Sequence, residues 1–257
     1  MKTLLSALIL AVAAQASMAA IQTKVIEYKQ GDAALEGVLT YDDSISGKRP
    51  GVLVVHQWKG LSDYEKKRSE MLAKLGYNVF ALDIYGKGIR PAAPADAGKE
   101  AGKYKGNRPL LRERALAGLE VLKKDERTDT SKVAAIGYCF GGTTVIEMAR
   151  AGADVAGVVS FHGSIDSPTP ADGAKIKAKI LVCHGDVDPF VAQKDIDAFN
   201  AEMRAHKVDC QFISYPGAVH SFTDWTATAP TGGARYQEAA DKRSWEHMKA
   251  FFAELFK

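Results

Sequence analysis

The stretch Val133-Ala-Ala-Ile-Gly-Tyr-Cys-Phe-Gly-Gly142 decides how this chain of 257 residues is expected to fold. An apolar run ends in Gly137-Tyr-Cys-Phe-Gly141, and a helix-compatible run over residues 143–150 follows at once. This order predicts a buried strand, a sharp turn with Cys139 at its apex, and a helix. The flanking glycines permit the close approach of strand and helix that a residue at positive φ imposes. The pattern indicates a reactive thiol at a helix N-terminus, although a buried structural cysteine fits the pentapeptide equally well.

Apolar runs and helical periodicities alternate on both sides of this stretch. Two runs that flank Gly31-Asp32 predict an N-terminal β-hairpin, at 25–28 and 35–41. Further strands are expected at 51–57, 78–85, 155–161, 178–184 and 211–215. Helices are expected at 63–75, 94–104, 110–124, 192–206 and 236–256. A hairpin followed by strand–helix alternation predicts an α/β fold with one doubly wound, mostly parallel sheet.

The composition is that of an ordinary globular enzyme or binding protein. The formal net charge is only +3, and basic and acidic residues are interspersed, so no nucleic-acid surface is indicated. The three cysteines, Cys139, Cys183 and Cys210, are expected to be thiols, because an odd count leaves at least one unpaired. The histidines and cysteines lack the spacing of a metal site, so no metal is expected. Nothing in the sequence marks a subunit interface.

Residues 1–19 are expected to be a secretory signal peptide, and residues 20–257 a single α/β domain. Lys2 provides the positive start, residues 4–14 form an uncharged apolar segment too short to span a bilayer, and Ser17-Met-Ala19 offers small residues for cleavage. The mature chain is therefore expected in the periplasm or outside the cell, without a membrane anchor.

Two polar residues follow later predicted strands and complete a catalytic arrangement with Cys139. Asp188 follows the strand at 178–184, and His220 follows the strand at 211–215. Because the carboxyl ends of parallel strands share one edge of a sheet, these residues are expected to converge there. His220 would take the thiol proton, and Asp188 would orient the imidazole. Asp186 is the alternative for the acid, but it is better explained as a turn residue.

Other residues near the strand ends are expected to bind substrate or the developing oxyanion. The N–H groups of Phe140 and Trp58 are the candidate oxyanion donors, since each follows a strand at the same edge. The candidates for substrate binding are Gln57, Tyr138, Asp224 and Trp225. Three more histidines end strands and are expected to be structural or to line the crevice, namely His56, His162 and His184.

The motifs around these residues resemble the dienelactone hydrolase family of α/β-hydrolases. The resemblance runs from Gly51-Val-Leu-Val-Val-His-Gln57 through the Cys139 pentapeptide to Pro216-Gly-Ala-Val-His-Ser-Phe222. It implies the α/β-hydrolase fold, a Cys139–His220–Asp188 triad, oxyanion donors at Phe140 and Trp58, and no cofactor. The family usually has Glu at the position of Gln57, where it helps to activate the thiol. Dienelactone hydrolases proper have Arg near Asp224, where it binds the substrate carboxylate.

The expected function is hydrolysis of small esters or lactones through an acyl-thioenzyme. Gln57 and Asp224 motivate an alternative, in which the fold is kept as a binding protein and catalysis is impaired. A thiol redox protein is less well supported, because Cys139 has no C-x-x-C partner.

Overall fold

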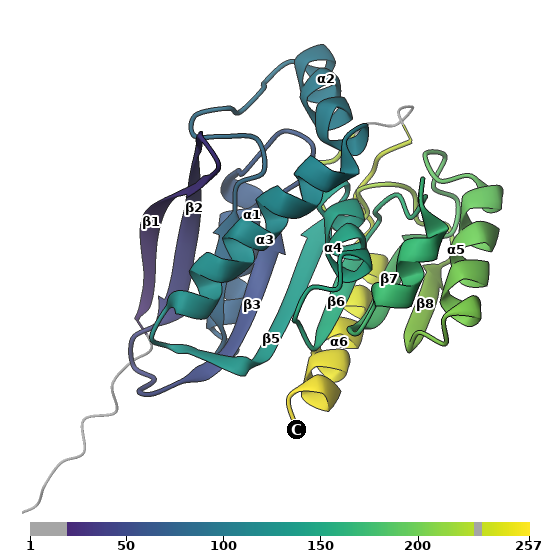
Figure 1. Cartoon of the computed structure of the whole chain (residues 1–257). Helices are drawn as coiled ribbons and strands as arrows, with labels where there is room; N and C mark the ends of the chain where they lie inside the picture. The colour runs from purple at the N-terminus through teal and green to yellow at the C-terminus, as the bar shows by residue number, and fades with distance from the viewer. Residues whose placement is uncertain (1–19, 229–232) are drawn as a thin grey trace, which may run out of the picture.

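A computed structural model describes residues 20–228 and 233–257 (Figure 1). The expected signal peptide, residues 1–19, lies outside the described residues. Eight strands form one sheet in the order β1-β2-β4-β3-β5-β6-β7-β8. Their bounds are β1 Ile21–Gln30, β2 Ala33–Asp42, β3 Arg49–Val55, β4 Asn78–Leu82, β5 Thr128–Tyr138, β6 Gly157–Phe161, β7 Lys179–Gly185 and β8 Cys210–Tyr215.

The sheet has the topology that the sequence predicts. β1 and β2 form an antiparallel hairpin around Gly31 and Asp32, and β2 pairs antiparallel with β4. The remaining neighbours are all parallel, from β4 and β3 across to β7 and β8. The mostly parallel α/β sheet with an N-terminal hairpin is therefore confirmed, and the parallel strands end at one common edge.

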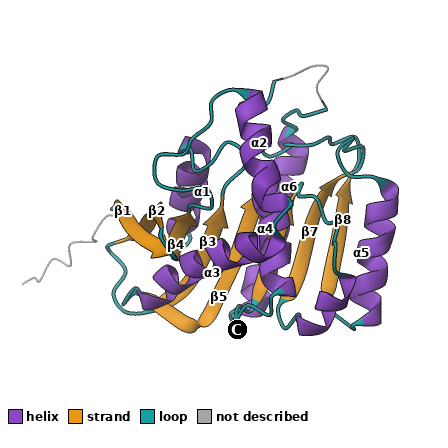
Figure 2. Cartoon of the chain, turned by 45° about the horizontal axis from the view of Figure 1, so that its top comes forward, coloured by secondary structure: helices purple, strands orange, loops and turns teal. Residues whose placement is uncertain are grey.

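Helices cover both faces of the sheet (Figure 2). The buried side chains of α3, α4 and α5 belong to one core cluster, and those of α1 and α6 to the other. α2 stands above the edge at which the parallel strands end (Figure 2). The helix bounds are α1 Asp63–Ala73, α2 Pro94–Lys105, α3 Arg108–Lys124, α4 Phe140–Arg150, α5 Gln193–Ala205 and α6 Glu238–Leu255.

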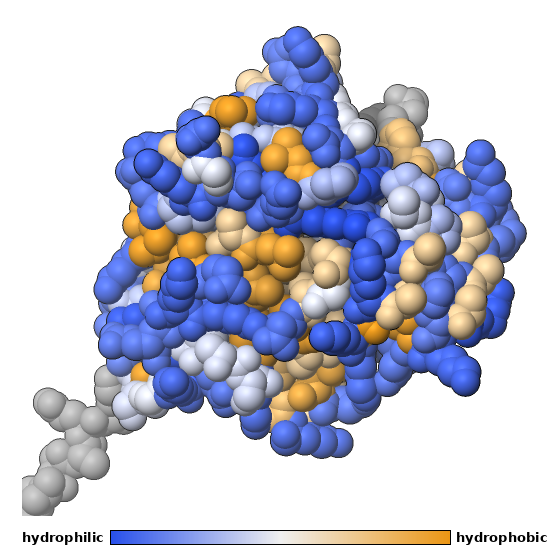
Figure 3. Space-filling model, in the orientation of Figure 1, coloured by the Kyte–Doolittle hydropathy of each residue, from blue (hydrophilic) through white to orange (hydrophobic). Residues whose placement is uncertain are grey.

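The helical periodicity of the sequence predicts which side chains face the sheet. In α3, the four residues expected on one face are all buried, namely Leu111, Ala115, Leu119 and Leu122. Figure 3 shows that hydrophilic side chains cover most of the molecular surface seen there, with hydrophobic groups near the middle, over the region of α3 and α4. Among the described helices, none combines the length and apolar character that crossing a bilayer requires.

Strand β4 ends earlier than expected because a buried carboxylate begins a turn there. The sequence predicts a strand to Tyr85, but β4 ends at Leu82. The Asp83 carboxylate accepts hydrogen bonds from the N–H groups of Tyr85 and Gly86. These donors would point to a neighbouring strand if the ladder continued, so the carboxylate competes with it. A short 3-10 helix, η1 Pro170–Lys175, was also not expected.

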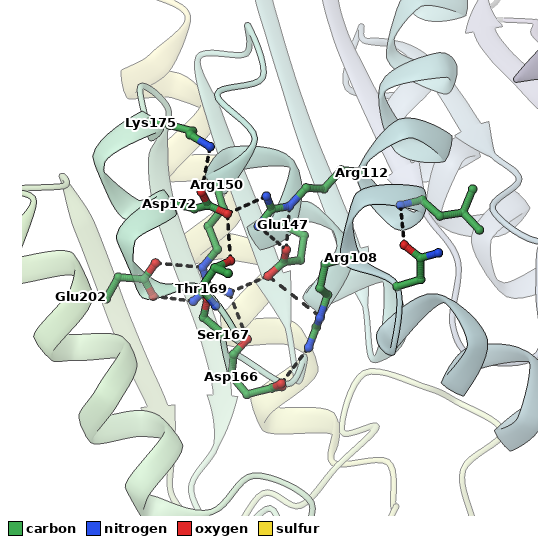
Figure 4. A network of polar contacts seen from close by, with 12 residues as sticks. Arg108, Arg112, Glu147, Arg150, Asp166, Ser167, Thr169, Asp172, Lys175 and Glu202 are labelled. Atoms are coloured by element: carbon green, nitrogen blue, oxygen red, sulfur yellow. Dashed lines mark hydrogen bonds and ion pairs between the residues drawn. The ribbon is translucent and has the colours of Figure 1, made fainter. Parts of the chain in front are cut away.

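A buried ionic network joins α4 to the segments on either side of it (Figure 4). The fully buried Arg150, at the end of α4, pairs with Glu147 and with Glu202 of α5. It also donates to the main-chain carbonyls of Ile165 and Asp166. Removing one member of such a network leaves an uncompensated buried charge. The loop after β6 is therefore attached to the body of the protein by charge-assisted hydrogen bonds.

Candidate active site

Cys139 occupies a strained turn between β5 and α4. Its φ and ψ are 55° and −115°, and Phe140 directly begins the helix. A Cβ atom at Gly137 would overlap with the main chain of Gly141, and one at Gly141 would overlap with the carbonyl of Val55 in β3. Only glycine fits at both positions, as the sequence pattern predicts. The turn places the thiol at the edge where the parallel strands end.

Cys139, His220 and Asp188 form one hydrogen-bonded series. His220 Nε2 lies 3.0 Å from Cys139 Sγ, and its Nδ1 lies 2.8 Å from Asp188 Oδ2. The second carboxylate oxygen of Asp188 accepts the N–H of Phe190 at 2.9 Å. The competing acid, Asp186, is exposed and is not part of the series. Because Nδ1 faces a carboxylate, the imidazole carries a proton there, and Nε2 is the nitrogen that exchanges a proton with the thiol.

The electrostatics of the pair favour thiolate and imidazolium. Burial raises the pKa of the Cys139 thiol, but the positive charge and hydrogen bond of His220 outweigh it and hold that pKa below its usual value. The Phe140 N–H and the charge of Lys105 act in the same direction. Burial alone would lower the pKa of His220, whereas the Cys139 thiolate and Asp188 raise it. Both shifts express one attraction between opposite charges in a water-poor site.

The loop after β3 carries the second expected oxyanion donor, Trp58. Glu65 fixes this loop, because its carboxylate accepts the N–H of Gln57 at 3.0 Å and also closes a capping box with Ser62 at the start of α1. The Tyr85 hydroxyl donates to the Trp58 carbonyl at 2.8 Å. The Trp58 N–H has no acceptor within the described part of the chain. The Trp58 N–H and the Phe140 N–H, which contacts Cys139, therefore stay the two candidate oxyanion donors.

A cavity of about 730 Å³ opens above Cys139 and His220. α2 contributes Ala101 and Lys105 to its lining, and Phe190 contributes to it from beside the His220 ring. Lys105 was not singled out from the sequence, because a lysine in a Lys- and Gly-rich helix gives no signal of its own. Its Nζ donates to Ser164 Oγ at 3.3 Å, and among the described residues that line this cavity it is the one lysine or arginine.

The four residues expected to bind substrate lie outside the walls of the cavity. Tyr138 is fully buried and stacks on Phe161 at a centroid distance of 4.7 Å, so it has no surface to offer a substrate. Trp225 packs over Arg68, with 4.1 Å from the guanidinium carbon to the ring centroid. The Tyr138 side chain thus lies in the core, and that of Trp225 is directed toward α6, where its Nε1 donates to Asp241.

The two positions that depart from the family pattern contact each other. Gln57 Nε2 donates to Asp224 Oδ2 at 3.0 Å, although 167 residues separate them. Asp224 Oδ1 accepts from the N–H and the hydroxyl of Thr226. The amide and the carboxylate therefore bind each other, and neither residue lines the cavity.

The other strand-end histidines are buried, as expected of structural residues. His56 joins two loops, with Nδ1 2.6 Å from the Gln57 carbonyl and Nε2 accepting the N–H of Ile84. His184 lies against the ring of Phe212. His162 differs, because it contacts the main chain of Cys139. No cluster of possible metal ligands occurs among residues 20–228 and 233–257.

The lowered pKa of Cys139 predicts a selective alkylation profile. The thiolate is the reactive form, so the iodoacetamide rate should fall only as pH drops through a midpoint below about 8.5, the usual thiol value. His220→Gln removes the stabilising cation and should move this midpoint upward. Burial raises the pKa of Cys183 and Cys210 to about 12, so these thiols are internal controls that should stay unmodified in the folded protein. If the pH midpoint of Cys139 alkylation is the same in His220→Gln as in wild type, this account is wrong.

The Gln57–Asp224 contact predicts strong coupling between these positions. Gln57→Glu sets two carboxylates against each other and should cost about 1 kcal/mol of stability, as measured by urea unfolding. The double variant Q57E/D224N exchanges amide and carboxylate and should recover most of this loss, with D224N alone completing the cycle. If the changes in unfolding free energy of the two single variants simply add up in the double variant, the contact contributes nothing to stability.

Comparisons with known proteins agree with this geometry. The sequence profile described as the dienelactone hydrolase family matches residues 35–256. An uncharacterised protein of Caenorhabditis elegans is 39% identical over 152 residues, which cover 57% of this chain and 94% of the relative. A Bradyrhizobium protein named "Probable 2-oxo-3-(5-oxofuran-2-ylidene)propanoate lactonase" is 25% identical over 213 residues, covering 79% and 83% of the two chains.

Similarity of structure extends over almost the whole described chain. The crystal structure of a dienelactone hydrolase-like promiscuous phosphotriesterase from metagenomic libraries superimposes with a TM-score of 0.88 at 38% identity. The match covers 92% of this chain and 99% of that one. The chain therefore belongs to the dienelactone hydrolase family of α/β-hydrolases and is a hydrolase that acts on ester or lactone bonds.

Proposed function

We propose that the chain hydrolyses small esters or lactones through a Cys139–His220–Asp188 triad and an acyl-thioenzyme. The observation that carries this proposal is the continuous series from Cys139 Sγ through His220 to Asp188, with distances of 3.0 and 2.8 Å. Geometry of this kind lets a histidine move protons at the nucleophile while a carboxylate fixes its tautomer.

In the acylation half, the Cys139 thiolate attacks the carbonyl carbon of the substrate. The carbonyl π-electrons move to oxygen, and the N–H groups of Phe140 and Trp58 stabilise the resulting oxyanion. One such donor typically contributes about 3 kcal/mol to the transition state. The intermediate then expels an alkoxide, which takes the Nε2 proton of His220. A lactone ring opens at this step, and the new hydroxyl stays on the acyl group.

In the deacylation half, His220 acts as a base. Its neutral Nε2 takes a proton from water as the water oxygen attacks the thioester carbonyl. The second tetrahedral intermediate collapses, the carbon–sulfur bond breaks, and the acid leaves. Cys139 is again a thiolate beside the His220 imidazolium, so the cycle closes.

The cavity supports a small, partly apolar substrate. Its volume of about 730 Å³ lies within the usual range for small-molecule sites. Lys105 gives it one positive charge, which suits a substrate that carries a carboxylate. The Bradyrhizobium relative is named for a lactone of an oxo acid, and this similarity supports the same class here.

The test is a substrate panel combined with trapping of the intermediate. The panel contains p-nitrophenyl acetate, matched esters with and without a carboxylate, a lactone, and a phosphotriester, the last because of the metagenomic neighbour. Wild type should show turnover and, after rapid acid quench, a mass increase equal to the acyl group on the Cys139 peptide. Cys139→Ala should lose about 10³-fold or more in kcat/KM, as expected for a missing nucleophile.

The control is Cys210→Ala, which removes a partly buried thiol in β8 and should leave the rate unchanged. Equal rates for wild type and Cys139→Ala would overturn the proposal. Ligand retention without turnover and without an adduct would favour the alternative of a binding protein that has kept the fold.

We also propose that the chain is exported. The positive start, short apolar segment and small residues within 1–19 support cleavage near Ala19 and delivery to the periplasm or the medium. The intact mass of protein recovered from the periplasmic fraction should lack these residues. Full-length protein confined to the cytoplasm would contradict export.

A further inference from the structure

Three non-glycine residues at positive φ gather around the site. They are Cys139 at 55°, His162 at 41° and Ser221 at 56°, and Lys207 is the one other example among the described residues. A buried non-glycine residue holds such a conformation only where its surroundings enforce it, and such residues concentrate at functional sites. Cys139 and Ser221 flank the proposed chemistry directly, whereas His162 lies behind it and has no part in the mechanism above.

His162 contacts the nucleophile through the main chain. It follows β6 and is 1% exposed. The Cys139 N–H makes a three-centre hydrogen bond, to the Phe161 carbonyl at 3.0 Å and to His162 Nδ1 at 3.1 Å. Because Nδ1 faces an N–H donor, it must be the unprotonated nitrogen of the ring. The imidazole is therefore neutral, and its proton lies on Nε2.

The Nε2 atom connects the ring to the loop that carries His220. It lies 2.8 Å from Oγ1 of Thr223, three residues after His220. With the proton on Nε2, Thr223 Oγ1 is the acceptor there, and the Thr223 hydroxyl is left to donate to the Tyr64 hydroxyl at 2.7 Å. Tyr64 in turn donates to the Thr223 carbonyl at 3.2 Å. Every donor in this series of hydrogen bonds thus has an acceptor, which fixes the direction of each bond.

A buried arginine lies at the far end of this series of hydrogen bonds. Arg68 of α1 donates to the Tyr64 hydroxyl at 3.1 Å and to the Thr223 carbonyl at 2.9 Å, and it pairs with Asp241 of α6. Burial lowers the pKa of His162, and the charges of His220, Arg68 and His184 lower it further. The ring of His162 therefore stays neutral when the adjacent His220 ring, 5.2 Å away between centroids, becomes an imidazolium.

We propose that His162 is a positioning residue that sets the distance between the Cys139 thiolate and the His220 imidazolium. It is the direct link between the nucleophile's own amide and the histidine loop, and both of its nitrogens are engaged in that link. A displacement of about 1 Å between reacting groups can cost as much as 10²-fold in rate. This inference rests on the proposed function for its kinetic part, but the thiolate pKa reports on it without turnover.

Side-chain replacements separate the two bonds of the ring. The Oδ1 of asparagine superimposes on Nδ1, so His162→Asn can keep the bond to Cys139 and loses the bond to Thr223. The Nε2 of glutamine reaches toward Thr223, so His162→Gln keeps that bond and loses the acceptor for Cys139. Thr223→Val removes the far partner without touching the histidine. Asparagine also tolerates positive φ better than most residues.

The matched control is Thr128→Val at the opposite end of β5. Thr128 is 1% exposed, and its hydroxyl donates to the Leu122 carbonyl and accepts from Asn78. The substitution thus removes two buried hydrogen bonds, as Thr223→Val does, but far from the site. It should lower the thermal midpoint and leave both the thiolate pKa and kcat unchanged.

The experiment measures three quantities for each full-length variant: the pH midpoint of Cys139 alkylation, kcat and KM for p-nitrophenyl acetate, and the thermal midpoint. His162→Gln should raise the alkylation midpoint and lower kcat roughly ten-fold or more with little change in KM. His162→Asn and Thr223→Val should fall between it and wild type. If these variants lose thermal stability but keep wild-type midpoint and kcat, as Thr128→Val should, His162 is merely structural and the proposal is overturned.

The outcomes also separate this inference from the proposed function. Absence of turnover and of an acyl adduct in wild type would remove the proposed function, while a raised alkylation midpoint in His162→Gln would still support the positioning role. Turnover through Cys139 with an unshifted midpoint in every variant would keep the function and overturn the inference. Should His162→Gln fail to fold, Thr223→Val decides the question alone.

Discussion

The close packing of α4 against the ends of β3 and β5 is the constraint on which the site depends. Gly137 and Gly141 leave no space for a Cβ atom, because each faces main-chain atoms of a neighbouring segment. Cys139 is consequently held at positive φ, and Phe140 begins the helix with its N–H directed at the sulfur. Main-chain sterics alone thus place the Cys139 thiol and the Phe140 N–H together at the start of α4.

The loops around the Cys139 turn lack regular secondary structure. Hydrogen bonds to buried charged side chains fix their positions. Glu65 fixes the loop that carries Trp58 by accepting main-chain donors from Gln57 and Ser62. Arg150 fixes the loop after β6, which brings Ser164 to the cavity wall. Charged groups at such positions are costly to bury unless every partner is present. The same contacts that stabilise the loops therefore also limit the freedom of the groups facing a substrate.

Periodicity and turn chemistry were enough to predict the sheet, the hairpin and the order of the helices. The convergence of Cys139, Asp188 and His220 also followed from the sequence, because parallel strands share one edge. The direction in which the side chains below that edge point could not be predicted from the sequence. Tyr138 and Trp225 belong to the core around Arg68, since the register of strand and helix, absent from a linear pattern, decides which way they point. The sequence gives no signal for Lys105 and leaves His162 as a structural or crevice-lining residue, because distant segments make the contacts that distinguish them.

Gln57 stands where the resembled family usually has glutamate, and this difference removes a potential negative charge from this side of the site. A carboxylate beside Cys139 would raise the pKa of the thiol, since two like charges resist forming together. A neutral amide imposes no such cost, and here it is directed to Asp224 instead. Burial of the sulfur opposes its ionisation, whereas His220, the Phe140 N–H and Lys105 all favour the thiolate. These three groups therefore lower the pKa of the Cys139 thiol and oppose the effect of its burial. The Asp224 carboxylate accepts from Gln57 and Thr226 and is not among the residues that line the cavity.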